Sequence, residues 1–279
     1  MIDSHVHVWT LEPKRYPWHQ TLAHVPIPTK PATAETLLAE MDRAGVSHAV
    51  LVQPSVYGSS NDYLCDALDR HPSRFIGVCL LDPQATDAGD KLRHWCVERG
   101  CRGLRINLIG HDDASWILDT ARAGLWQAAR EIGASVSFQM RPEQAGFVGR
   151  LARMQPGITF VADYLGTEAF HDASGAAAIG HLAGSPNVWF KLLAVGQDSR
   201  RSYPFQDLWP MYEHAVRAFG AHRIVFGTDF PHVCRACTYE QAVAWLRELP
   251  FLDSRERALI AEANARRLWG LDNTIESAS

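Results

Sequence analysis

The feature that most limits how this chain can fold is a regular alternation of short β-branched runs with longer segments of helical period. We expect eight strands, each followed by a helical segment, and a last helix at residues 254–269. The expected strands cover residues 2–8, 48–53, 75–81, 102–107, 135–140, 158–163, 188–193 and 224–229. Strands that alternate with helices favour a parallel sheet, and the number eight favours a closed α/β barrel, the (β/α)8 or TIM barrel.

An open, doubly wound sheet is the alternative fold, but no glycine-rich dinucleotide-binding motif follows any expected strand. The chain has 279 residues, of which 47% are hydrophobic, and this suits a single-domain barrel over residues 1–279. Residues 10–32 form a long excursion rich in proline and aromatic residues after the first strand. In a barrel this excursion is a βα loop, so we expect it over the mouth of the active site.

Charge and cysteine content limit the partners and the compartment. A net charge of −4 gives no electrostatic case for binding nucleic acid or an anionic membrane. Because the chain has neither a long apolar run nor the layout of a signal peptide, we expect a soluble, cytoplasmic protein. We expect its partner to be a small-molecule substrate, and it could be a homodimer. Six scattered cysteines are typical of reduced thiols, and the Cys234/Cys237 pair lacks the second pair of a zinc ribbon.

The first expected strand carries two histidines one residue apart, in the stretch MIDSHVHVW. Side chains alternate along a strand, so Asp3, His5 and His7 are expected to share one face. Active sites of (β/α)8 barrels lie at the C-terminal ends of the strands, and several polar residues fall there. These residues are Gln53, Arg105, Asn107, Gln139, Arg141, Lys191 and Asp229.

The HxH of the first strand and the aspartate of GTDFPH resemble the amidohydrolase superfamily, and more narrowly its branch of lactonases and decarboxylases. The stretches LVQPSVYGSSNDYL, RGLRINL, NVWFKL and ANARRLWGL extend the likeness, which is greatest to dicarboxylate-lactone and sugar-lactone hydrolases. The resemblance implies that His5 and His7 polarise a substrate carbonyl and that Asp229 is the general base. It also implies substrate contacts for Gln53 and Arg105, and we add Asn107, Gln139, Arg141, Lys191 and His232 as substrate-binding candidates.

The chain departs from this family pattern at the end of the sixth strand. The sequence reads ADYLG, with Tyr164 where relatives present a histidine, and we expect Tyr164 to protonate or orient the departing ring oxygen. His5, His7 and Asp229 could bind one divalent metal ion such as zinc. The alternative is a site without a cofactor, in which the histidines donate hydrogen bonds. The positive charges of Arg105, Arg141 and Lys191 favour the metal-free alternative.

The sequence therefore predicts a hydrolase that opens an anionic or sugar-derived lactone. In this hypothesis Asp229 takes a proton from water, and Arg105, helped by Arg141 and Lys191, binds the anionic side of the substrate. Two alternatives stay open: a metal-dependent non-oxidative decarboxylase of the same superfamily, and a catalytically inactive barrel that binds a small molecule.

Overall fold

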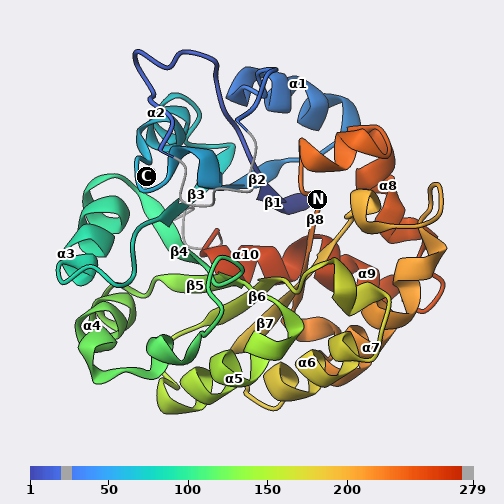
Figure 1. Ribbon diagram of the computed structural model, residues 1–279. Coiled ribbons are helices and arrows are strands. Elements are labelled where there is room, and N and C mark those ends of the chain that lie inside the picture. Colours follow the sequence, from blue (N-terminus) through green and yellow to red (C-terminus); the bar gives the residue numbers. More distant parts are fainter. Residues whose placement is uncertain (20–26, 272–279) are drawn as a thin grey trace, which may run out of the picture.

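The computed structural model describes residues 1–19 and 27–271, and within them the chain forms an eight-stranded parallel barrel. The strands are hydrogen-bonded in the order of the sequence, and the helices surround them (Figure 1). This confirms the predicted (β/α)8 fold. The strands are β1 (Ile2–Val6), β2 (His48–Val52), β3 (Phe75–Leu80), β4 (Cys101–Asn107), β5 (Ser135–Gln139), β6 (Phe160–Tyr164), β7 (Val188–Leu193) and β8 (Ile224–Gly227).

The helices begin and end at local signals in the sequence. The side chain of Thr33 caps α1 by accepting a hydrogen bond from the amide of Thr36, and Gly45 ends that helix at a φ of 70°. None of the described helices is both long enough and apolar enough to cross a membrane. The helices are α1 (Ala34–Ala44), α2 (Asp62–Arg70), α3 (Ala88–Arg93), α4 (Ala123–Ile132), α5 (Ala145–Met154), α6 (Ser174–Ala183), α7 (Trp209–Phe219), α8 (Tyr239–Glu248), α9 (Ser254–Ala258) and α10 (Asn264–Trp269).

The barrel closes where the first strand meets the segment that follows the last. The amide of Asp229 donates to the carbonyl of His5 at 2.9 Å, and the amide of His7 donates to the carbonyl of Phe230 at 2.7 Å. The close approach needs a glycine in β8, because a Cβ at Gly227 would lie 2.7 Å from the Cβ of His5. Closure therefore brings the N-terminal histidines beside Asp229.

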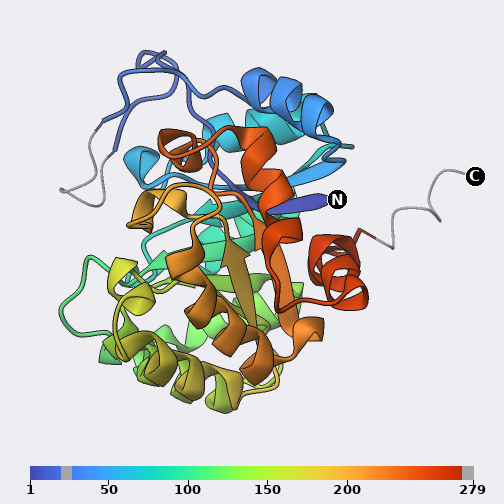
Figure 2. The same ribbon diagram turned by 90° about the vertical axis from the view of Figure 1, so that its right-hand side faces the viewer.

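The N-terminal end of the barrel is plugged. Trp269 of α10 is buried in the lumen together with Ile2 and Val225, and its ring lies 5.6 Å from Nζ of Lys191. Figure 2 shows α10 on one side of the barrel and the loop that follows β1 on the other. The C-terminal ends of the strands therefore form the accessible end, as in other (β/α)8 barrels.

One expectation about β1 is wrong. The pairing of β1 with β2 shifts register between Asp3 and Val6, so side-chain alternation is interrupted before the histidines. The carboxylate of Asp3 does not lie with the two imidazoles. It accepts hydrogen bonds from Thr228 at 2.6 Å and from Tyr239, at the start of α8, at 3.0 Å.

Candidate active site

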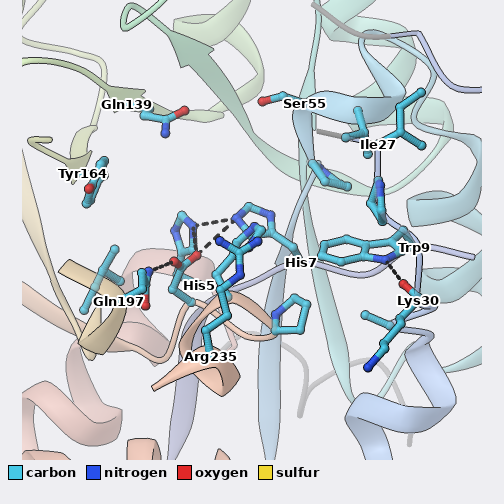
Figure 3. Close-up of a pocket in the computed structure, with 18 of the residues that line it drawn as sticks. His5, His7, Trp9, Ile27, Lys30, Ser55, Gln139, Tyr164, Gln197 and Arg235 are labelled. Carbon is cyan, nitrogen blue, oxygen red and sulfur yellow. Dashed lines mark hydrogen bonds and ion pairs between the residues drawn. The ribbon is translucent and has the colours of Figure 1, made fainter. Parts of the chain in front are cut away.

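Three side chains from opposite ends of the sequence meet at the accessible end of the barrel. Nε2 of His5 lies 3.1 Å from Nε2 of His7. Oδ1 of Asp229 lies 3.7 Å from the first of these nitrogens and 3.5 Å from the second (Figure 3). Asp229 has a φ of 60°, a left-handed conformation that aspartate adopts more readily than most residues. The structure thus brings together the two histidines and the aspartate that the sequence analysis selected.

The outer nitrogen of each imidazole is engaged by a neighbour. Nδ1 of His7 lies 2.7 Å from the carbonyl oxygen of Val52, which only accepts, so Nδ1 carries the proton and Nε2 directs a lone pair into the site. Nδ1 of His5 lies 3.2 Å from Oδ1 of Asp163 and 3.2 Å from Nζ of Lys191. It can donate to the carboxylate or accept from the ammonium, and the choice decides whether Nε2 of His5 carries a lone pair or a proton.

The two tautomers of His5 correspond to two states of the site. With the proton on Nε2, His5 donates to His7 and the pair is satisfied without a metal ion. With the proton on Nδ1, two lone pairs face each other at 3.1 Å and repel unless a cation lies between them. Two imidazoles and one carboxylate, whose ligand atoms lie within 4.8 Å of one another, form the three-ligand set of a catalytic zinc ion. The residues therefore fit a divalent metal ion.

A buried carboxylate behind His5 holds two cations. Oδ1 of Asp163 lies 2.5 Å from Nζ of Lys191, and its Oδ2 lies 3.2 Å from Nε of Arg105. All three side chains are buried, which charged groups tolerate only when they are paired. Burial alone would raise the pKa of Asp163, but Lys191, His5 and Arg105 hold it well below its usual range. Asp163 therefore keeps its charge and offsets one of the two positive charges beside it.

This network removes most of the charge argument against a metal ion. Lys191 and Arg105 are both paired with Asp163. The guanidinium of Arg141 donates to Glu143 at 2.7 Å and to the carbonyl of His111 at 3.1 Å. The sequence analysis missed Asp163, although an aspartate beside Tyr164 in an apolar strand and a lysine in VWFKLL already implied a buried pair.

A cavity of about 810 Å³ opens next to the three converging side chains (Figure 3). Its wall includes Trp9, Ser55, Arg105, Gln139, Tyr164, Leu193, Gln197, Asp198, His232 and Arg235. The described part of the expected loop contributes residues 27–32, and residues 20–26 lie outside the described residues. Arg105, Gln139, Tyr164 and His232 thus face the cavity, as expected of groups that contact a substrate.

Four residues that the sequence analysis assigned to substrate binding are not part of this wall: Gln53, Asn107, Arg141 and Lys191. The amide of Gln53 donates to the carbonyl of Ser60 at 2.6 Å, and the amide of Asn107 donates to the hydroxyl of Ser55 at 2.9 Å. Arg141 binds loop carbonyls and Lys191 binds Asp163. Their contacts show that these four side chains bond to neighbouring groups of the protein, and their contact with a substrate stays a prediction.

Two wall residues lie on the short turn η7 (Gly196–Asp198), which follows β7. The amide of Gln197 donates to Oδ2 of Asp229 at 2.8 Å. The carboxylate of Asp198 accepts hydrogen bonds from Tyr164 at 2.8 Å and from Thr167 at 2.7 Å. Burial raises the pKa of Asp198. The sequence analysis missed both residues, because they lie in an irregular segment without periodic pattern or motif.

The electrostatics of the site favour neutral forms of His5 and His232 and an ionised Asp229. Burial lowers the pKa of His5 to about 3 and that of His232 to about 4. Burial would raise the pKa of Asp229, but His7 and His232 lower it to about 2. Near neutral pH the site therefore contains lone-pair donors and one carboxylate, which suit a cation or a polarised water molecule.

Sequence comparisons agree with this arrangement. A family model described as Amidohydrolase matches residues 2–271. The chain belongs to the amidohydrolase family. This amidohydrolase is 28% identical to a 4-sulfomuconolactone hydrolase of Rhizobium radiobacter, over 82% of this chain and 75% of the relative. It is also 28% identical to an L-fucono-1,5-lactonase of Burkholderia ambifaria, over 97% and 96% of the two chains.

A solved structure from Pseudomonas putida, described as a 2-pyrone-4,6-dicarboxylic acid hydrolase, has the same fold. The two chains are 26% identical and superpose with a TM-score of 0.79, over 97% of each. The likeness thus extends over nearly the whole barrel.

Proposed function

We propose that this amidohydrolase hydrolyses the ester bond of a lactone ring. The observation that carries the proposal is the convergence of His5, His7 and Asp229 on one cavity at the C-terminal end of the barrel. Two of the relatives reported above are described as hydrolases of lactones, and the third as a hydrolase of a pyrone, which is also a cyclic ester. None of the three is described as a decarboxylase, the alternative that the sequence left open.

In the proposed reaction Asp229 is the general base. Its carboxylate accepts a proton from a water molecule while the oxygen of that water attacks the ring carbonyl. The ring C–O bond then breaks, and the proton passes to the departing oxygen, which gives an open-chain hydroxy acid. Gln197 donates to Oδ2 of Asp229 at 2.8 Å and so fixes the orientation of the base.

We propose that His5, His7 and Asp229 hold a divalent metal ion such as zinc in the active enzyme. When bound, such an ion polarises a carbonyl as a Lewis acid and lowers the pKa of water. A carboxylate with a pKa of about 2 is a weak base for ordinary water, so the ion would supply the missing activation. In the metal-free alternative, Nε2 of His5 is protonated and donates a hydrogen bond to the carbonyl oxygen.

Arg105 is a buried cation that lines the same cavity. Its Nε is held by Asp163 at 3.2 Å, and among the described residues its terminal nitrogens form no hydrogen bond. We propose that these terminal nitrogens contact an oxygen of the lactone ring that every substrate shares. Gln139 and His232 line the same cavity and would bind further polar groups of the substrate.

The experiment that tests the proposal is hydrolysis of a panel of γ- and δ-lactones by the wild type and by Asp229→Asn. We expect the wild type to open at least one class of lactone and the variant to lose more than tenfold in kcat/KM, or more than ~1.4 kcal/mol of transition-state stabilisation. Circular dichroism should show that the variant is folded. A variant that keeps over a tenth of the wild-type rate would refute the role of Asp229. A folded wild type that binds lactones without turnover would instead support the inactive binding barrel.

A further inference from the structure

Arg235 is an arginine that lines the cavity. It lies on the turn η10 (His232–Arg235), which follows β8, and its side chain is exposed at the cavity wall. Among the described residues Arg235 forms no hydrogen bond and no ion pair, whereas Arg105 is paired with buried Asp163. Figure 3 shows the side chain of Arg235 extending from its turn towards His5 and His7. A guanidinium in this position is available to a bound molecule.

The turn that carries Arg235 is hydrogen-bonded to the backbone of the proposed base. The amide of Val233 donates to the carbonyl of Asp229 at 3.2 Å, and the amide of Cys237 donates to the carbonyl of Val233 at 3.1 Å. These bonds hold Asp229 and Arg235 on one folded segment. A group bound by Arg235 would therefore place the rest of the molecule at a fixed distance from Asp229, which is what a reaction at a neighbouring carbonyl requires.

One carboxylate also lines the cavity. Asp198 lies on η7, and the hydroxyls of Tyr164 and Thr167 donate to its carboxylate at 2.8 and 2.7 Å. An anionic substituent would be repelled by Asp198 and attracted to Arg235, so its favoured position is at the guanidinium. A planar guanidinium also matches the two oxygens of a carboxylate and can bind both at once.

We propose that Arg235 binds an exocyclic carboxylate of the substrate, which makes the preferred substrate a lactone that carries a carboxylate beside its ring. The proposal rests on the lactone hydrolysis proposed above. Arg235 contacts a group that does not react, so the interaction is the same in the ground state and in the transition state. Its loss should then raise KM and leave kcat close to that of the wild type.

The test uses γ- and δ-lactones with a ring carboxylate and the same lactones with a neutral carboxamide in its place. We expect Arg235→Met to raise KM for the carboxylates at least tenfold and to change KM for the carboxamides less than twofold. Arg235→Lys should lie between the wild type and Arg235→Met. The control is Arg247→Met, on an exposed face of α8 outside the cavity wall, because it removes the same charge and should leave both KM values unchanged.

Ionic strength and direct binding give further readouts. Raising the salt concentration should increase KM of the wild type for the carboxylates and have little effect on Arg235→Met. Titration calorimetry with glutarate should show at least tenfold weaker binding to Arg235→Met than to the wild type. An equal loss on both sets of lactones, or no loss on either, would overturn the role of Arg235 while lactone hydrolysis stands. If no lactone is opened and glutarate binding still depends on Arg235, the proposed reaction fails and the anion site remains.

Discussion

Replacing Asp163 by asparagine tests whether the buried charge network holds the site together. Asp163→Asn keeps the shape of the side chain and removes the charge that Lys191 and Arg105 share at 2.5 and 3.2 Å. Breaking a buried pair by removing one partner costs about 3–5 kcal/mol, because the remaining charge has lost its compensation. Domains are stable by only about 5–15 kcal/mol, so the loss would be a large fraction of the total. We expect a folded variant with clearly reduced stability.

The assay is urea denaturation of the wild type, of Asp163→Asn and of the double variant Asp163→Asn/Lys191→Met. Burial already lowers the pKa of Lys191 while Asp163 raises it, so without Asp163 the lysine should release its proton and limit the loss. Replacing the lysine removes the cost of burying an amine that must either stay charged without a partner or give up its proton, so we expect the double variant to be more stable than the single one.

The control is Glu213→Gln, which breaks an exposed pair with Arg217 at 4.0 Å and should change stability by less than about 1 kcal/mol. Two outcomes would refute the reasoning about the network. One is an Asp163→Asn variant that loses less stability than Glu213→Gln. The other is a double variant that is less stable than Asp163→Asn, because Lys191 would then contribute through packing and not through its charge.

Three further predictions concern the site itself. Protein loaded with zinc should hold about one ion per chain when measured by elemental analysis. Chelation should remove both the metal and the activity. Full activity in metal-free protein would instead support hydrogen bonding by His5. Tyr164→Phe removes a hydrogen bond to the carboxylate of Asp198, which is worth roughly 1.5–3 kcal/mol. The substitution should lower the melting temperature of the protein and reduce kcat/KM less than tenfold. A larger loss in kcat would show that the hydroxyl acts on the substrate. Arg105→Met should reduce kcat/KM equally for carboxylated and neutral lactones, and a loss confined to the carboxylated ones would assign the anion to Arg105.

Most of the fold could be predicted from the sequence, because strand and helix periods are local properties. The limits of β7 match the expected strand, and the other strands differ from expectation by one or two residues at one end or, for β6, at both ends, which is where local signals are weakest. Two aspects of the strands depended on tertiary structure. The register shift in β1 turned Asp3 away from the histidines. The sixth strand begins at Phe160 and extends to Tyr164, so Asp163, the last residue of the expected strand, is followed by one more strand residue.

The sequence predicted a site residue only where a side chain suited to the chemistry also lies at the C-terminal end of an expected strand. His5, His7 and Asp229 lie at the ends of neighbouring strands, so the barrel alone brings them together. The network of Asp163 could have been inferred, because a lysine in an apolar strand needs a buried partner. The contacts of Gln197 and Asp198 could not, since they depend on how one turn packs against Asp229 and Tyr164. The same holds for Arg235, which no strand or motif distinguishes from other surface arginines.

The tyrosine at position 164 explains how this site can work with three ligands. Its hydroxyl donates to Asp198 at 2.8 Å, and burial, together with the charge of Asp198, raises the pKa of the phenol. Tyr164 therefore stays protonated and is a poor metal ligand, so it does not replace the histidine that the resemblance to the family led us to expect there. A divalent ion at His5, His7 and Asp229 would keep at least one open position, which is the arrangement of catalytic and not of structural zinc sites. His5, His7 and Asp229 line the cavity, so a substrate oxygen that enters it can reach all three residues.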